Sequence, residues 1–247
     1  MKMNSVLLIP SLNPPKESLD RMCQMKRFFR DVVVVNDGSS KCYDRFFSAL
    51  SRNGLVVRYH HTNRGKGDAL KTGFSYIKEH FPGRDVVTAD SDGQHTIKDI
   101  LAVSEKLRFL GEKSIVLGKR NIVGSNAPIA SKGGNSLTSF FIEALFKRNI
   151  VDTQSGLRGI GNKLIGIAME IDGNRYEYET AFLLYCLKER INIEQIPIET
   201  VYENNNKGSH FHKLRDSYLI YKTIFKEYLK IQSPFHSMPK KGPQKVI

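Results

Sequence analysis

The sequence has few cysteines, no long apolar run and no glycine-rich dinucleotide fingerprint, and each absence excludes a class of protein. Cys23, Cys42 and Cys186 are odd in number, far apart and without CxxC spacing, so neither a disulfide framework nor a structural zinc site is expected. The longest apolar runs are only a few residues, far short of the ~20 that cross a bilayer. An apolar strand starting at Ser5 leaves no room for a signal peptide. We therefore expect a cytoplasmic protein.

Acidic residues are also scarce, and the chain carries a net charge of +13. Such a surface favours anionic partners, which include nucleotides, phosphorylated lipids, an acidic membrane leaflet and nucleic acid. Residues 201–247 hold nine Lys and Arg against three Asp and Glu, so the C-terminal end is a basic element. The sequence has no zinc-finger, RRM or helix-turn-helix signature, and a nucleic-acid partner is therefore not expected.

What the sequence does contain is a regular alternation of short apolar runs and amphipathic stretches over its first half. This alternation predicts an α/β protein with a mostly parallel central sheet and helices on both faces. The four consecutive valines at 32–35 are typical of a strand buried on both sides. The predicted strands lie near residues 5–9, 32–36, 55–59, 85–89 and 114–118, and the predicted helices near 16–29, 43–52, 66–80 and 97–110.

The second half is less regular, and we expect it to complete the same domain. A loop rich in Gly, Asn and Ser is predicted over residues 121–136. It is followed by helices over 137–146 and 177–190 and a strand over 193–201, and the C-terminal helices are expected to be amphipathic. We predict a single domain over residues 1–231, with a nucleotide-binding half (1–120), an acceptor-side half (121–231) and a basic, disordered tail (232–247).

The stretch that carries most chemical information follows the predicted strand near 85–89. Asp90, Asp92 and Gln94 place three oxygen ligands within five residues, the donors that Mg²⁺ or Mn²⁺ prefers. An Asp-x-Asp-Gly sequence is also an ordinary turn. At the carboxyl end of a buried strand, where open α/β sheets bind ligands, the metal reading gains weight.

Other polar loops follow the other predicted strands. Pro10 and Ser11 end the first strand, an Asn-Asp-Gly-Ser sequence containing Asp37 ends the second, and Lys66 stands between two glycines at a helix start. Glycines and a lysine at a helix N-terminus suit a phosphate, although Gly-Lys-Gly alone is weak evidence. Arg120 and Arg158, each near a glycine, would ordinarily be solvated surface residues.

Taken in order, these motifs resemble the family 2 nucleotide-sugar glycosyltransferases of the GT-A fold, over about residues 5–225. The resemblance is closest to the branch of dolichyl-phosphate and polyprenyl-phosphate sugar transferases. It implies an inverting, metal-dependent transfer of a sugar from a UDP- or GDP-linked donor to a polyprenyl phosphate or another membrane-associated acceptor. The alternative is a family 2 enzyme acting on a glycan hydroxyl in cell-surface polysaccharide synthesis.

The resemblance also implies roles for individual residues. Donor-binding positions are Pro10, Ser11, Asn13, Asp37, Asn63, Lys66, Asp68, Asp90, Ser91 and Arg120. Metal ligands are Asp90, Asp92 and Gln94, and catalytic positions are Asp92, Glu179 and Arg158. Acceptor or phosphate contacts are Lys132, Asn135, Ser155, Arg158, His210 and Lys213.

The acceptor decides whether a base is needed, because a sugar hydroxyl must lose a proton whereas a lipid phosphate is already anionic. Aromatic and basic residues at helical spacing near 137–145 and 221–230 favour the lipid phosphate and peripheral contact with the cytoplasmic face of a membrane, directly or through a membrane-bound partner subunit. The same aromatic faces could instead pack in the core or in a homo-oligomer. A non-catalytic scaffold would not need two unneutralised carboxylates, and a phosphatase of the DxD type would need an Asp where Pro10 stands.

Overall fold

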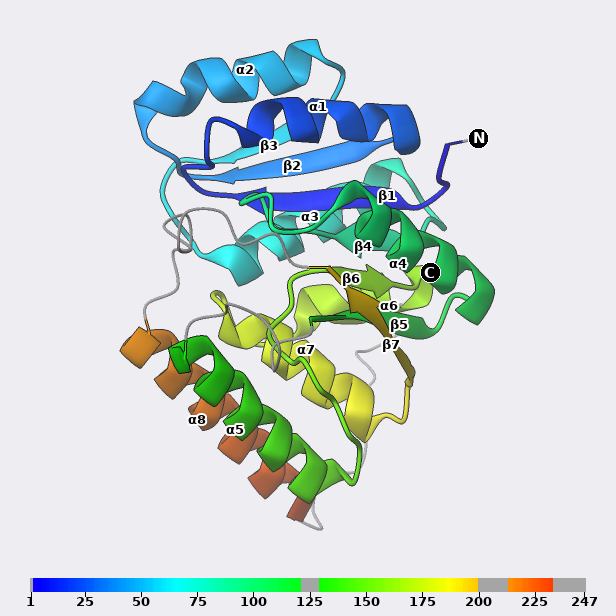
Figure 1. Cartoon of the computed structure of the whole chain (residues 1–247), viewed down its shortest axis with the longest axis vertical. Coiled ribbons are helices and arrows are strands. Elements are labelled where there is room, and N and C mark those ends of the chain that lie inside the picture. Colours follow the sequence, from blue (N-terminus) through cyan, green and yellow to red (C-terminus); the bar gives the residue numbers. More distant parts are fainter. Residues whose placement is uncertain (1, 121–128, 200–212, 233–247) are drawn as a thin grey trace, which may run out of the picture.

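A seven-stranded sheet runs through the molecule with helices on both of its faces (Figure 1). The computed structural model describes residues 2–120, 129–199 and 213–232. The strand order is β3-β2-β1-β4-β6-β5-β7. The strands are β1 (Val6–Ser11), β2 (Val32–Asp37), β3 (Val56–His60), β4 (Val86–Thr88), β5 (Ser114–Arg120), β6 (Arg158–Ile160) and β7 (Asn192–Ile198).

Successive strands of the first half pair in parallel, as the alternating pattern predicts. β1 lies between β2 and β4, with Leu7 opposite Val32 on one side and Val87 on the other. β6 pairs antiparallel with both β4 and β5, whereas the other pairings of the described strands are parallel. The predicted mostly parallel α/β sheet is confirmed.

The helices form two layers because alternate strand residues point to opposite faces. They are α1 (Ser18–Phe28), α2 (Asp44–Arg52), α3 (Lys66–His80), α4 (Ile97–Leu110), α5 (Ile129–Phe146), α6 (Asn162–Glu170), α7 (Glu177–Lys188) and α8 (Lys213–Gln232). Leu7 and Val34 pack with α1, α2 and α4, whereas Leu8 and Val35 pack with α3, α6 and α7. A short 3-10 helix (Lys41–Tyr43) leads into α2.

Local sequence explains where individual helices begin and end. Thr96 caps α4 by accepting a hydrogen bond from the Asp99 backbone N–H at 3.1 Å, and Gly111 ends the helix with φ 87°. Phe46, Phe47 and Leu50 give α2 one buried apolar face. These are the signals from which the first-half helices are predictable.

The second half departs from the prediction in three places. α5 already begins at Ile129, so the predicted loop over 121–136 is wrong from residue 129 onward. β6 and α6 are absent from the prediction, because a three-residue strand with Gly159 at its centre carries no alternating pattern. The predicted strand over 193–201 ends at Ile198.

The strand order reverses at β1, with β2 and β3 on one side and β4 on the other. In open α/β sheets ligands bind at such a switch point, outside the carboxyl ends of the strands. The loop after β1 follows Ser11, and the loop after β4 contains Asp90. The topology therefore brings the motifs of the first half to one place.

Candidate active site

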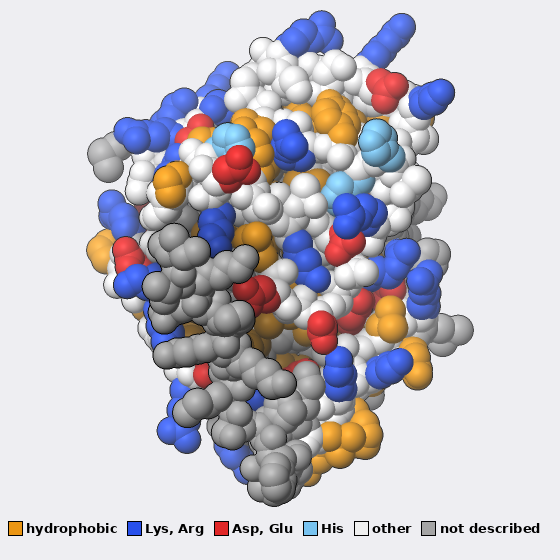
Figure 2. All heavy atoms as spheres, turned by 180° about the vertical axis from the view of Figure 1, so that it is seen from behind, with side chains coloured by type: hydrophobic (Ala, Val, Ile, Leu, Met, Phe, Trp, Pro, Cys, Tyr) orange, Lys and Arg blue, Asp and Glu red, His pale blue; other side chains and the backbone are white. Residues whose placement is uncertain are grey.

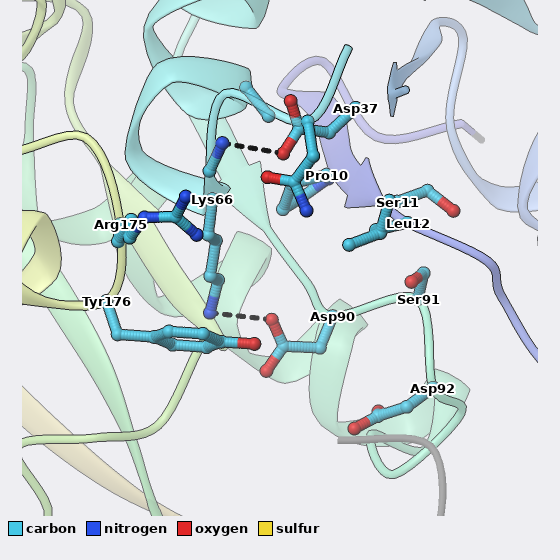
Figure 3. Close-up of a pocket in the computed structure, with 13 residues that line it drawn as sticks. Pro10, Ser11, Leu12, Asp37, Lys66, Asp90, Ser91, Asp92, Arg175 and Tyr176 are labelled. Atoms are coloured by element: carbon cyan, nitrogen blue, oxygen red, sulfur yellow. Dashed lines mark hydrogen bonds and ion pairs between the residues drawn. The ribbon is translucent and has the colours of Figure 1, made fainter. Parts of the chain in front are cut away.

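A cavity of about 190 Å³ lies at the carboxyl ends of β1, β2 and β4 (Figure 3). It is polar, and α3 and the loop before α7 complete its wall. Seven of the expected donor-binding residues and the metal candidate Asp92 line it. The lining residues are Pro10, Ser11, Leu12, Asp37, Asn63, Gly65, Lys66, Ala69, Asp90, Ser91, Asp92, Arg175 and Tyr176.

The loop after β4 presents Asp90 and Asp92 to this cavity. It is a tight turn, in which Gly93 has φ 80° and the Gln94 backbone N–H donates to Asp92 Oδ1 at 3.1 Å. Arg21 of α1 holds the turn by donating to the Gly93 carbonyl. The sequence can therefore form a turn and bind a ligand at the same time, because the turn directs both carboxylates toward the cavity.

The carboxylate of Asp90 is paired with Lys66, the first residue of α3. Lys66 Nζ lies 2.7 Å from Asp90 Oδ1 and 2.7 Å from Glu179 Oε2, and its side chain is only 12% exposed. Burial alone would raise the pKa of Asp90, but the Lys66 ammonium and the nearby His95 hold it well below its usual range. Burial alone would lower the pKa of Lys66, but the two carboxylates raise it above its usual value.

The pKa of Asp92 shifts in the opposite direction to that of Asp90. Burial, and next the negative charge of Asp90, raise the pKa of Asp92. A cation between the two carboxylates would remove this penalty. Within the described part of the chain, no group of three or more His, Cys, Asp or Glu side chains could hold a metal ion unaided.

Asp37 is tied to the loop that precedes α3. Its carboxylate accepts hydrogen bonds from the backbone N–H groups of Arg64 (2.9 Å) and Gly65 (2.8 Å), and His60 Nδ1 lies 2.7 Å from Oδ1. Gly65 has φ 104°, and a Cβ there would lie 2.4 Å from the Asn174 carbonyl oxygen. Asp37 thus positions Lys66 as well as lining the cavity.

Three expected donor-binding residues stand outside the cavity wall and bind the protein instead. Asn13 joins two loops, since its N–H donates to Ser39 Oγ at 2.8 Å and its Oδ1 accepts from the Ser40 N–H at 2.9 Å. Asp68 pairs with Arg64 at 3.3 Å in the first turn of α3. Arg120 makes a two-pronged contact with buried Asp152, at 2.6 and 3.0 Å.

Arg158 is buried, and it is therefore not the solvated surface residue that an arginine ordinarily is. Its side chain is 4% exposed, and its guanidinium donates to the carbonyls of Ser155 (3.1 Å), Glu179 (2.7 Å) and Thr153 (2.9 Å). The residue starts β6, and these bonds fasten the preceding loop to α7. Ser155 is 2% exposed, and its Oγ accepts from the Leu157 N–H at 3.4 Å.

Glu179 is also buried, and it lies behind Lys66 as seen from the cavity. It is 6% exposed, and its Oε2 is the atom that contacts Lys66. Its Oε1 has no hydrogen-bond partner, although Arg158 Nε approaches to 3.7 Å. The structure thus brings Glu179 next to Asp90 through Lys66.

The side chains of the remaining acceptor-side candidates lie outside the described part of the structure. His210 lies outside the described residues. Lys132 and Asn135 belong to α5 and Lys213 begins α8, but their side chains are outside the described part of the structure.

Sequence reasoning missed several contributors to the site. Arg175 and Tyr176 line the cavity from the loop before α7, with the Tyr176 ring 5.7 Å from Lys66 Nζ. Burial raises the pKa of Tyr176 to about 12. His95, in the same Asp-Gly-Gln-His sequence as the carboxylates, is 4% exposed with neither ring nitrogen hydrogen-bonded. For His95 the adjacent motif was an available signal; for Arg175 and Tyr176 there was none.

Comparison with known proteins places this geometry in a family. The family model described as "Glycosyl transferase family 2" matches residues 14–165, which include Asp37, Lys66, Asp90 and Asp92. The chain belongs to glycosyl transferase family 2. It is therefore a glycosyltransferase, as the resemblance implied.

Curated relatives include enzymes that act on dolichyl phosphate. The chain is 28% identical over 216 residues to the UDP-N-acetylglucosamine–dolichyl-phosphate N-acetylglucosaminyltransferase of Methanococcus voltae, covering 79% of this chain and 85% of the relative. It is 24% identical over 221 residues to the dolichyl-phosphate beta-glucosyltransferase of Saccharomyces cerevisiae, covering 78% and 65%.

Solved structures confirm the GT-A fold. Glucosyl-3-phosphoglycerate synthase from Mycobacterium tuberculosis superposes with a TM-score of 0.69 at 16% identity, covering 91% of this chain and 80% of that one. Mannosyltransferase PcManGT from Pyrobaculum calidifontis, solved with GDP-Man and Mn²⁺, gives a TM-score of 0.57 at 16% identity, covering 97% and 66%. At these identities the likeness concerns the fold.

Proposed function

We propose that this glycosyltransferase moves a sugar from a UDP- or GDP-linked donor to a polyprenyl phosphate or another membrane-associated acceptor, using Mg²⁺ or Mn²⁺. One observation carries the proposal: Asp90 and Asp92 face a polar cavity at the switch point of the sheet, and Lys66 stands beside them. The relatives that are named dolichyl-phosphate transferases support the acceptor class.

The residues present fit a divalent cation. Mg²⁺ is usually held by one or two carboxylates together with substrate phosphates, and not by an all-protein cage. Asp90 and Asp92 offer two hard oxygen ligands, and Gln94 follows in the same turn. Burial and the negative charge of Asp90 raise the pKa of Asp92, and a divalent cation at this position would offset both effects. When bound, the ion would absorb the charge that develops on the leaving diphosphate.

The transfer would invert the anomeric carbon, as the family resemblance implies, through one in-line displacement. The protein then has to orient donor and acceptor and stabilise the departing charge, and no covalent sugar–enzyme bond is needed. Lys66 and Arg175, which both line the cavity, are the cations available for this in the described part of the wall (Figure 3).

The state of the carboxylates favours an acceptor that is already ionised. A hydroxyl acceptor needs a base within hydrogen-bond reach. Glu179, the expected candidate, is buried and bound to Lys66, and Asp37 accepts two backbone N–H bonds and contacts His60. A phosphate acceptor removes the need for such a base.

The outer face of α5 and α8 suits an anionic leaflet. Phe140, Tyr218, Phe225 and Leu229 are each more than half exposed, and Lys222 lies over the Tyr218 ring. Figure 2 shows hydrophobic side chains with Lys and Arg beside them at the end of the molecule where these helices lie. Among the described residues, none of the helices is both long enough and apolar enough to cross a bilayer. We propose that this face makes the peripheral membrane contact.

The direct test of the donor site is a thermal-shift panel of UDP-, GDP- and dTDP-sugars with and without Mn²⁺. One donor class should raise the melting temperature only when the metal is present. Asp92→Ala should abolish this stabilisation while leaving the melting temperature of the unliganded protein nearly unchanged. Full stabilisation of Asp92→Ala would disprove the metal assignment.

The acceptor is tested by transfer assays with the donor so identified. Transfer to a polyprenyl phosphate in detergent micelles should exceed transfer to free glycans. Glu179→Gln should then reduce transfer to the lipid phosphate only in part. Transfer to a hydroxyl alone, abolished by Glu179→Gln, would instead establish the glycan acceptor.

A further inference from the structure

Lys66 occupies the position of a counter-cation at the metal candidate Asp90. Its ammonium contacts Asp90 and Glu179 at the same distance, 2.7 Å, and is almost enclosed. Backbone geometry fixes its origin, because it is the first residue of α3 and follows Gly65, which is anchored to Asp37. The side chain is therefore confined to the neighbourhood of these two carboxylates.

A monovalent and a divalent cation cannot both use Asp90 Oδ1 at full strength. Two cations that contact the same carboxylate oxygen in a mostly buried site repel each other with an energy that is large compared with thermal energy. Binding of the metal must therefore weaken or break the contact between Lys66 and Asp90. The ammonium then needs another anion, because an unpaired buried charge is costly.

Glu179 provides that second anion without a large movement. It already contacts Lys66 through Oε2, while Oε1 has no hydrogen-bond partner. It lies behind Lys66 and outside the wall of the cavity, so the donor would not compete for it. Asp90, by contrast, faces the cavity in which donor and metal would meet.

We propose that Lys66 competes with the metal for the Asp90 carboxylate, and that Glu179 is the carboxylate that holds the Lys66 ammonium when the metal displaces it from Asp90. This inference rests on the proposed metal-dependent function and assigns Lys66 and Glu179 to positioning roles in the same site. Metal affinity without nucleotide is kept low by Lys66. A donor diphosphate restores it by adding ligands for the metal and a further anion for the displaced ammonium.

The inference predicts opposite effects for two neutralising substitutions. Lys66→Met frees Asp90 and should tighten Mn²⁺ binding in the absence of nucleotide by about tenfold or more. Glu179→Gln leaves Lys66 with Asp90 alone and should weaken Mn²⁺ binding several-fold. The measurement is the loss of the free Mn²⁺ electron paramagnetic resonance signal on titration of the full-length protein.

A double-mutant cycle separates this mechanism from a simple change of net charge. If Glu179 acts through Lys66, the effect of Glu179→Gln should nearly vanish in the Lys66→Met background. If Glu179→Gln changes the Mn²⁺ affinity equally in both backgrounds, Glu179 contributes only long-range charge. That result would overturn its role in holding the displaced Lys66 ammonium. Lys163→Met, which breaks the exposed pair with Glu112 (2.9 Å), is the matched control and should not change Mn²⁺ binding.

The outcomes are decisive in each case. Lys66→Met that binds Mn²⁺ no more tightly than the parent overturns the competition. Because loss of Lys66 removes the cation between buried Glu179 and partly exposed Asp90, folding of this variant is checked by circular dichroism. If it does not fold, Glu179→Gln decides alone, and unchanged or tighter Mn²⁺ binding refutes the inference.

The proposed function can fail separately. A protein whose Mn²⁺ affinities follow the predicted order, but which no sugar nucleotide stabilises, would retain the competition and lose the donor assignment. Lys66→Met combined with Asp90→Asn should lose the gained affinity, which locates the metal at Asp90.

Discussion

Replacing Arg158 with methionine should destabilise the fold far more than substitution of a typical arginine. The side chain is 4% exposed and donates three hydrogen bonds to backbone carbonyls at 2.7 to 3.1 Å. Hydrogen bonds from a charged donor contribute about 1.5–3 kcal/mol each, and such contributions add incompletely. Since three buried carbonyls also lose their donor, we expect the free energy of unfolding to fall by about 3–5 kcal/mol.

Unfolding by guanidinium chloride, followed by circular dichroism, measures this loss of stability. A reduction of this size is a large part of the 5–15 kcal/mol typical of a domain, so the midpoint should fall markedly at constant m-value. Arg158→Lys should recover only part of it, because an ammonium cannot reach three diverging carbonyls in the geometry of a guanidinium. Arg148→Met, at an exposed arginine, is the matched control and should change stability by less than about 0.5 kcal/mol.

The opposite result would refute the structural role. If Arg158→Met unfolds within about 1 kcal/mol of the parent but transfers no sugar, the guanidinium must reach substrate in the working enzyme. The expectation that Arg158 contacts the acceptor phosphate would then be favoured over the buried arrangement. Stability and transfer must therefore be measured on the same preparations.

Three further predictions concern other parts of the molecule. Gly156→Ala should weaken Mn²⁺-dependent donor binding, measured by thermal shift, because the added Cβ would lie 2.3 Å from Asp90 Oδ2; unchanged binding would contradict this packing. Burial raises the pKa of Cys186 to about 12, so at pH 8 it stays a thiol and should react with Ellman's reagent only after exposed Cys42; equal rates would contradict the burial. Phe225→Ser should reduce sedimentation with anionic vesicles without lowering the melting temperature, and full retention would argue against the membrane face.

The convergence of the strand-end motifs could be predicted from the sequence. Alternating strands and helices imply parallel strands, and parallel strands place their carboxyl ends along one edge of the sheet. Pro10, Asp37, Lys66 and Asp90 meet around one cavity for this reason. Their order along the chain was therefore sufficient, without knowledge of any side-chain contact.

The contacts within the site could not be predicted in the same way. The pairing of Lys66 with Glu179 joins α3 to α7, and it depends on how the second half packs against the first. β6 sets that packing, yet it has only three residues and runs antiparallel to its neighbours. The burial of Arg158 follows from the same strand. Nothing in the local sequence distinguishes it from a surface arginine.

The charge of the pocket sets a condition on the acceptor. Asp90 and Asp92 line the cavity together with the cations Lys66 and Arg175, and Asp37 is compensated by its own donors. The charges of a donor diphosphate and a divalent ion nearly cancel, so binding of both leaves the net charge of the cavity little changed. An anionic acceptor must then be met by positive charge from elsewhere on the molecule. The net charge of +13 attracts anions to the surface, and we propose that this excess favours a phosphate acceptor over a neutral glycan.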